Sequence, residues 1–149
     1  MIYLAQTNMV RKFSVVLIVD DSQAFRVFCK ESIKSSIKWI HILEAKDGIE
    51  ALKQYQLHKP DLILLDIKMP RLDGTKVLEL IKKNDSVTKI LVTSAFAGDQ
   101  DSINKFLKLG ATAFVPKPMN RINLMKSITE ILAIGKMPGT NFVKDLPAN

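Results

Sequence analysis

The stretch that decides the fold runs Leu62-Ile63-Leu64-Leu65-Asp66 and continues as Ile67-Lys68-Met69-Pro70-Arg71-Leu72-Asp73-Gly74. A strand that is buried on both faces appears in the sequence as a continuous apolar run, so an acid that ends such a run lies at the carboxyl end of a strand. Open parallel sheets bind their ligands at that edge. Asp66 is therefore the first candidate for a functional residue.

Three further apolar runs also end in polar side chains. Asp20 and Asp21 follow the run 15–19, and Ser94 follows the run 90–93. Lys117 comes after the run 114–116. If all four runs are parallel strands, they deliver three carboxylates, one hydroxyl and one ammonium to the same edge of one sheet.

Short apolar runs alternate with segments of helical period five times along the chain. This alternation predicts an α/β fold with a doubly wound, five-stranded parallel sheet. We expect strands near 14–19, 39–44, 61–65, 88–93 and 112–115, and helices near 22–35, 47–58, 74–84, 99–109 and 119–134. The domain is expected to span 13–134, with an N-terminal extension 1–12 and a C-terminal tail 135–149 that both look loose.

Local signals support the helices. Asp47, Asp73 and Asp99 stand where N-caps are needed, and Gly110 stands where the fourth helix should end. Apolar residues keep helical spacing in three of these segments, which are Ala24, Val27 and Phe28 in the first helix, Leu78 and Ile81 in the third, and Ile103, Phe106 and Leu107 in the fourth.

The composition fits one aliphatic α/β domain that stays inside the cell. The chain has 149 residues, of which 47% are hydrophobic and 7% aromatic. Cys29 is the single cysteine, so no intramolecular disulfide can form. We expect it to behave as a small buried or half-buried apolar residue, which fits a reducing cytoplasm. No apolar run approaches the roughly 18 residues that a membrane span requires, and the N-terminus carries no export signal.

The charge is basic, with 22 Lys and Arg against 15 Asp and Glu and a formal net charge of +7. A basic surface can attract nucleic acid or acidic proteins. Here the charges are scattered rather than clustered, which favours a solvated lysine-rich surface. We therefore expect no direct DNA binding.

Several motifs together resemble the receiver domain of two-component response regulators from about Phe13 to Ile134. They are Val19-Asp20-Asp21, Glu44-Ala45-Lys46-Asp47-Gly48-Ile49-Glu50-Ala51-Leu52, the stretch 61–74, Thr93-Ser94-Ala95, and Gly110-Ala111 leading to Lys117-Pro118. The resemblance implies a stand-alone receiver with a flavodoxin-like (βα)5 fold, strand order 2-1-3-4-5, and a cis peptide between Lys117 and Pro118.

The resemblance also implies the chemistry of the site. Asp66 would accept a phosphoryl group from a sensor histidine kinase or phosphotransfer protein, while Lys117 and Ser94 would contact the phosphoryl oxygens. The same residues would hydrolyse the aspartyl phosphate slowly. The chain is thus expected to be a signalling protein and not a conventional enzyme. Lys68 and Phe96 match positions that overhang the site, and we expect them to slow this hydrolysis.

A divalent cation is expected beside Asp66. Three neighbouring carboxylates cannot all stay ionised without a compensating charge. Magnesium (Mg2+) suits the site because it binds one or two carboxylates and keeps water and phosphate oxygens as its other ligands. By resemblance, Asp21 and Asp66 bind the ion directly, Asp20 acts mainly through water, and the backbone carbonyl of Lys68 adds a ligand.

The signal is expected to leave through the surface of the receiver. The family pattern makes Ser94 and Phe114 a switch, in which Phe114 turns inward after the Ser94 hydroxyl moves toward the phosphoryl group. Output would then use the face formed by residues 99–134, through a downstream partner or a phosphorylation-dependent dimer. Four basic residues there favour an acidic partner, and they are Lys105, Lys108, Arg121 and Lys126.

Three other interpretations of the function remain. A haloacid-dehalogenase-like phosphohydrolase also uses a strand-end aspartate with magnesium, but it needs a second aspartate at the position of Lys68. A basic nucleic-acid-binding module is suggested by charge alone, without a recognisable motif. A receiver that cannot be phosphorylated is disfavoured because Asp20, Asp21, Asp66, Ser94 and Lys117 fill all five site positions.

Overall fold

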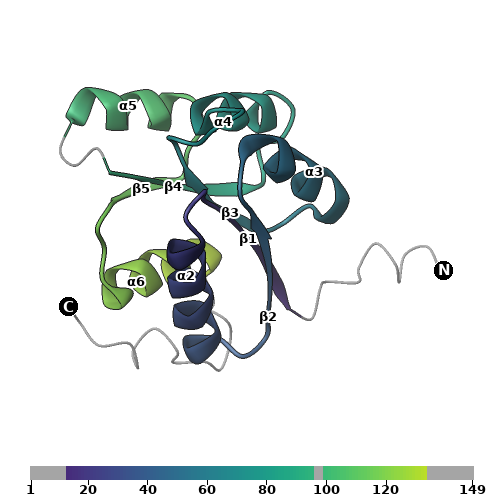
Figure 1. Ribbon diagram of the computed structural model, residues 1–149, viewed down its shortest axis with the longest axis vertical. Coiled ribbons are helices and arrows are strands. Elements are labelled where there is room, and N and C mark those ends of the chain that lie inside the picture. Colours follow the sequence, from purple (N-terminus) through teal and green to yellow (C-terminus); the bar gives the residue numbers. More distant parts are fainter. Residues whose placement is uncertain (1–12, 96–98, 134–149) are drawn as a thin grey trace.

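The computed structural model describes residues 13–95 and 99–133, which form one parallel sheet with helices on both faces (Figure 1). The sheet order is β2-β1-β3-β4-β5. The strands are β1 (Ser14–Val19), β2 (Ile40–Ala45), β3 (Leu62–Asp66), β4 (Lys89–Ser94) and β5 (Ala113–Pro116). The helices are α2 (Gln23–Ser36), α3 (Gly48–His58), α4 (Gly74–Lys82), α5 (Gln100–Lys108) and α6 (Arg121–Leu132). The predicted fold class and strand order are confirmed.

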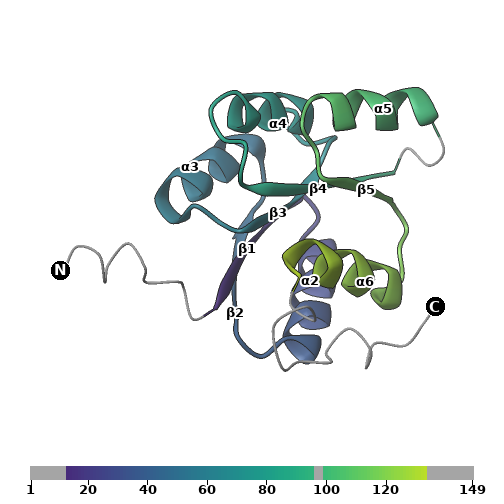
Figure 2. The same ribbon diagram turned by 180° about the vertical axis from the view of Figure 1, so that it is seen from behind.

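Two apolar layers sandwich the sheet. Helices α3, α4 and α5 cover one face and α2 and α6 cover the other, as both views show (Figures 1 and 2). Alternate residues of β3 pack in the two layers. Ile63 and Leu65 lie in the layer of α4, while Leu62 and Leu64 lie in the layer of α2 and α6. Because β3 is buried along its whole length, Asp66 is held at the end of a rigid central strand.

The helix signals are confirmed. Asp47, Asp73 and Asp99 are the N-caps of α3, α4 and α5, and each side chain accepts a hydrogen bond from a backbone N–H of the first turn. Gly110 follows α5 with φ of 106°, a left-handed conformation that glycine adopts without strain. The last four strands end one residue later than predicted, which makes Asp66 and Ser94 the final residues of β3 and β4.

The helical spacing of Ala24, Val27 and Phe28 matches the buried side of α2 only in part, because Phe28 packs against the core while the other two are exposed. The burial expected of Cys29 is confirmed. Ala24 is exposed and Val27 is 43% exposed, whereas Cys29, Ser32 and Ile33 are buried. Apolar residues occur on several sides of this helix, so spacing alone allows more than one orientation. Packing against α6 decides between them, and it turns Cys29 and Ile33 toward the sheet. In α4, Leu78 and Ile81 are buried, and in α5 the buried residue is Phe106 while Leu107 is 43% exposed.

Some expectations fall outside the described residues. These are the looseness of 1–12 and 135–149 and the shielding role of Phe96. Within the described part of the chain, no helix is long and apolar enough to cross a membrane.

Asp85 ties three elements together at the end of the sheet opposite Asp66. Its carboxylate accepts hydrogen bonds from the backbone N–H groups of Val87 and Thr88, at 2.8 and 2.9 Å. The hydroxyls of Thr88 and Tyr55 donate to it at 2.7 Å each. Burial opposes ionisation, but these donors outweigh it and hold the pKa of Asp85 well below its usual range. The network links α3, the end of α4 and the start of β4.

We expect Asp85→Asn to lower the free energy of unfolding by about 1 kcal/mol near neutral pH, because solvent screens part of the effect of a half-exposed group. The folded-state pKa lies below the unfolded value of about 3.9, so the stabilisation is present above that pH and is lost as the pH falls further. Urea unfolding of the wild type and of Asp85→Asn at about pH 7 and pH 3 measures the difference in their free energies of unfolding. The exposed Asp101→Asn is the control, and an Asp85→Asn deficit that is equal at both pH values would contradict the account.

Candidate functional site

Three carboxylates meet at the carboxyl edge of the sheet. Val19 of β1 lies opposite Leu65 of β3, so the next residues along the two strands are Asp20 and Asp66. One oxygen each of Asp20, Asp21 and Asp66 lie within 4.8 Å of one another. Asp20 and Asp66 are buried and Asp21 is exposed. The structure thus brings together all three predicted acids.

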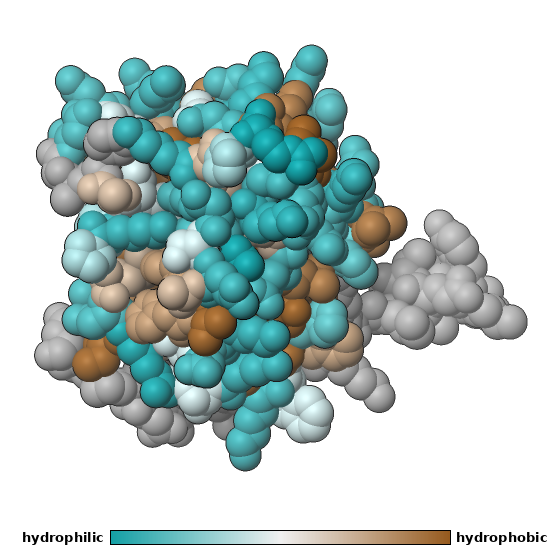
Figure 3. Space-filling view, in the orientation of Figure 1, coloured by the Kyte–Doolittle hydropathy of each residue, from teal (hydrophilic) through white to brown (hydrophobic). Residues whose placement is uncertain are grey.

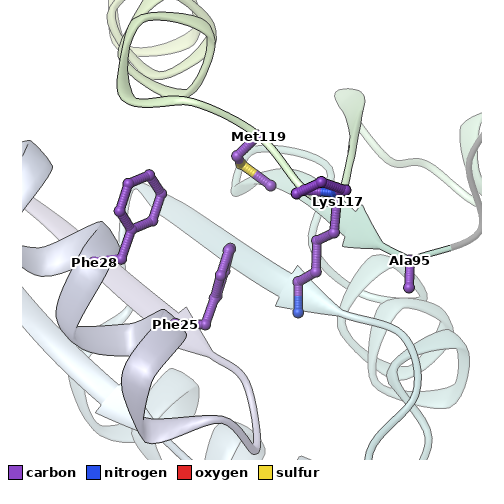
Figure 4. Close-up of a pocket in the computed structure, with 6 residues that line it drawn as sticks. Phe25, Phe28, Ala95, Lys117 and Met119 are labelled. Carbon is purple, nitrogen blue, oxygen red and sulfur yellow. The ribbon is translucent and has the colours of Figure 1, made fainter.

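Lys117 follows the last residue of β5, Pro116, and reaches this cluster. Figure 4 shows its side chain extended. Its Nζ lies 2.5 Å from Asp20 Oδ2 and 3.6 Å from Asp66 Oδ1. The other oxygen of Asp20 accepts a hydrogen bond from the Ser22 N–H at 2.9 Å. Both oxygens of Asp20 therefore already have donors from the protein. The Lys117–Pro118 peptide is cis, as the resemblance implied.

The environment of Asp66 favours a cation. Burial and the charge of Asp20 raise the pKa of Asp66 to about 6, although Lys117 works in the opposite direction. A divalent ion would stabilise the ionised form. The donor set fits Mg2+, because carboxylate oxygens this close can share one ion with oxygen ligands. Asp20, whose oxygens are already engaged, is better suited to contact through water.

Glycines let two loops pack closely around Asp66. A Cβ on Gly74 would lie 2.1 Å from the Asp66 carbonyl oxygen and 2.7 Å from the Ile67 Cα. A Cβ on Gly48 would lie 2.4 Å from the Leu72 carbonyl oxygen. The loop between β3 and α4 is thereby held against both the end of β3 and the start of α3. It carries Lys68, whose side chain is exposed.

Two arginines that the sequence did not single out fasten the loops beside the acids. Arg26 of α2 donates to the Asp20 carbonyl oxygen at 2.7 Å and pairs with Glu44 of β2 at 3.0 Å. Arg71 pairs with Asp47 at 3.2 Å. A hydrogen bond from the Glu50 N–H is the main reason that the pKa of Asp47 is lowered. The only sequence signal was the place of Arg26 in the first turns after Asp21.

The predicted switch residues lie on one face of the sheet. Ser94 is buried at the end of β4, and Phe114 of β5 lies opposite Val92. Side chains alternate along a strand, so Val92, Ser94 and Phe114 share a face. Phe114 is half-buried and stacks on Phe106 of α5, with ring centroids 6.2 Å apart and planes at 13°. The predicted movement of Phe114 stays a prediction.

We expect Gly74→Ala to lower the stability by about 1–3 kcal/mol, because the atoms that the new methyl group meets are backbone and cannot turn aside. The new methyl group would displace the backbone of Asp66, so the affinity for Mg2+ should also fall. Chemical denaturation and calorimetric titration of Mg2+ measure the two effects. Thr75→Ala, at the next position of α4, is the matched control. Unchanged stability and Mg2+ affinity in Gly74→Ala would contradict the close approach.

Known proteins are similar to this chain in sequence and fold. Residues 16–129 match the response regulator receiver domain family. The chemotaxis protein CheY of Listeria monocytogenes is 35% identical over 113 residues, which cover 76% of this chain and 93% of that protein. A protein-glutamate methylesterase/protein-glutamine glutaminase of Pyrococcus horikoshii is 39% identical over 120 residues, or 79% of this chain. The chain spans only 33% of the length of that relative.

Solved structures of response regulators are also similar to this chain. A CheY-like response regulator receiver domain protein from Methanospirillum hungatei superposes with a TM-score of 0.73 at 30% identity, covering 81% of this chain and 94% of that one. CheY4 of Vibrio cholerae gives a TM-score of 0.73 at 26% identity, covering 80% and 98%. These findings favour neither the hydrolase nor the nucleic-acid-binding alternative. The chain belongs to the response regulator receiver domain family.

Proposed function

We propose that this receiver takes a phosphoryl group from a histidine kinase or phosphotransfer protein onto Asp66. The observation that carries the proposal is the position of Asp66. It is a buried carboxylate at the end of the central strand, 3.6 Å from the Lys117 ammonium and within 4.8 Å of two further acids. Asp66 is the acid of this cluster that belongs to the central strand itself.

In the proposed reaction an Asp66 oxygen attacks phosphorus while the bond from phosphorus to the donor nitrogen breaks. The donor histidine leaves with that electron pair, and Asp66 becomes an aspartyl phosphate. Phosphoryl transfer demands mainly alignment and positive charge around the phosphoryl oxygens. Lys117 supplies a point charge and Ser94 a hydroxyl donor. Water can later attack the same phosphorus, so the only catalysis that we assign to the chain is on itself.

The same acids are proposed to hold Mg2+. Asp21 and Asp66 would bind Mg2+ directly, Asp20 would contact it through water, and the Lys68 backbone carbonyl would complete the protein ligands. When bound, Mg2+ supplies positive charge to the phosphoryl oxygens. Hydrogen bonds from Lys117 and from the Ser22 N–H already orient the carboxylate of Asp20 for this role.

The output is proposed to run through the face of residues 99–134, toward a downstream protein or a second phosphorylated copy. Phe114 supports this, because it bridges the sheet near Ser94 and the helix α5 through its stacking on Phe106. Four exposed basic side chains lie on α5 and α6, namely Lys105, Lys108, Arg121 and Lys126. As in other kinase-fed receivers, we expect this signalling to take place in the cytoplasm.

Incubation with acetyl phosphate and Mg2+ should add one phosphoryl mass to the wild-type protein, as read by intact-mass spectrometry. Asp66→Asn should add none, because it removes the nucleophile. Asp101→Asn on α5 is the matched acid control and should behave like the wild type. Phosphoryl mass on Asp66→Asn, or labelling that persists when the metal is chelated, would overturn the assignment.

Phosphorylation should change partner affinity or self-association, and the Phe114→Ala and Lys108→Glu variants should weaken that change. A packed interior switches between discrete arrangements, and Phe114 is the side chain that would change place. Light scattering at low and high salt, with and without phosphorylation, measures self-association of each variant. Pull-down from cell extract measures partner binding. If both variants respond to phosphorylation like the wild type, the output leaves by another surface.

A further inference from the structure

Phe25 places its ring against the charged end of Lys117. The ammonium Nζ lies 4.2 Å from the centroid of the ring (Figure 4). A cation within about 6 Å of an aromatic face is attracted by the ring quadrupole. The same ammonium lies between Asp20 and Asp66. Lys117 is thus held by two carboxylates on one side and by an aromatic ring on another.

We propose that Phe25 is a positioning residue for phosphoryl transfer, which holds the Lys117 ammonium beside Asp66 when Mg2+ engages the carboxylates. The proposal rests on the proposed function of Asp66. It assigns Phe25 no contact with the phosphoryl group, and its effect passes through Lys117.

The need for such a residue follows from the distances. In the structure Lys117 is closer to Asp20, at 2.5 Å, than to Asp66, at 3.6 Å. A phosphoryl group on Asp66 would compete with Asp20 for the ammonium, and we infer that the ammonium shifts from Asp20 toward it. With a divalent cation held by Asp21 and Asp66 and contacted by Asp20 through water, the pull of both Asp20 and Asp66 on the ammonium would be weaker. The attraction to the Phe25 ring does not depend on those carboxylates, so it remains.

The surroundings of Phe25 support a fixed ring. Its N–H donates to the hydroxyl of Ser22, the N-cap of α2, at 3.2 Å. Its ring packs against Phe28 with centroids 6.0 Å apart. Both rings line an open pocket of about 400 Å³ whose other lining residues are Ala95, Lys117, Pro118 and Met119. Figure 3 shows that the face seen in Figure 1 carries a hydrophobic patch between hydrophilic areas. Of the residues that line the pocket, Phe25, Phe28, Ala95, Pro118 and Met119 are apolar. The low polarity of these neighbours strengthens a cation–π contact.

Phe28 provides a matched control. It lies one helical turn from Phe25, lines the same pocket and is also half-buried. Figure 4 shows the Phe25 ring nearer to the Lys117 ammonium than the Phe28 ring, which lies on the side of Phe25 away from Lys117. A general loss of pocket packing should therefore affect both variants, whereas loss of the ring–ammonium contact should affect Phe25 alone.

The first test is the rate of phosphorylation by acetyl phosphate in Mg2+. We expect Phe25→Leu to be about 3- to 10-fold slower than wild type, with Phe25→Trp and Phe28→Leu within about 2-fold of it. In a Lys117→Met background, Phe25→Leu should cause no further slowing. An unchanged rate in Phe25→Leu, equal slowing in Phe28→Leu, or failure of Phe25→Trp to restore the rate would each overturn the proposal.

The second test does not need phosphorylation. Protons that lie over an aromatic face are shifted upfield in NMR spectra, so the Lys117 ε-methylene signal of the Mg2+-loaded protein should lie upfield and return to its ordinary position in Phe25→Leu. Phe28→Leu should leave most of the shift in place. An ordinary Lys117 signal in the Mg2+-loaded wild type would overturn the proposal. If the wild type gains no phosphoryl group on Asp66, the proposed function fails, and this test still decides the placement of Lys117.

Discussion

The ion pair between Lys117 and Asp20, with Asp66 beside it, is the interaction on which the site depends. Asp20 and Asp66 are buried close to one another and to Asp21, which is unfavourable for three negative charges. One ammonium from the end of β5 compensates part of that charge. β1, β3 and β5 must therefore end at the same level, and the parallel sheet with order β2-β1-β3-β4-β5 meets this requirement.

The rest of the fold limits how far these groups can move. The apolar layers fix the strands, while Gly74 and Gly48 permit the loop after β3 to pack within van der Waals distance of its neighbours. Arg26 holds the backbone of Asp20 against β2, and Arg71 holds the loop to the cap of α3. A reaction that needs chiefly alignment and positive charge benefits from this restraint, because the strand ends and loops that carry the three acids stay in place while the side chain of Lys117 moves.

The sequence revealed those parts of the site that lie at strand ends. Asp66, Ser94 and Lys117 follow uninterrupted apolar runs, and a parallel sheet must bring such ends together. The burial of Cys29 agrees with its apolar setting in the sequence. The sequence could not reveal the full rotation of α2, because apolar side chains occur on several sides of this helix, and Val27 is exposed while Ile33 packs in the core beside α6. The contact of Phe25 with Lys117 depends on that rotation, so no local pattern could predict it. The roles of these residues in phosphoryl transfer remain predictions.

The central claim is that Asp66 accepts the phosphoryl group while Lys117 moves from Asp20 to the phosphoryl oxygens. A crystal structure of the protein with Mg2+ and beryllofluoride, which imitates a phosphoryl group on a carboxylate, tests both parts at once. We expect a beryllium–oxygen bond to Asp66 and the Lys117 Nζ within hydrogen-bond distance of a fluorine atom, about 3 Å. Beryllofluoride on a different carboxylate, or Lys117 still bonded to Asp20 with the group in place, would contradict it.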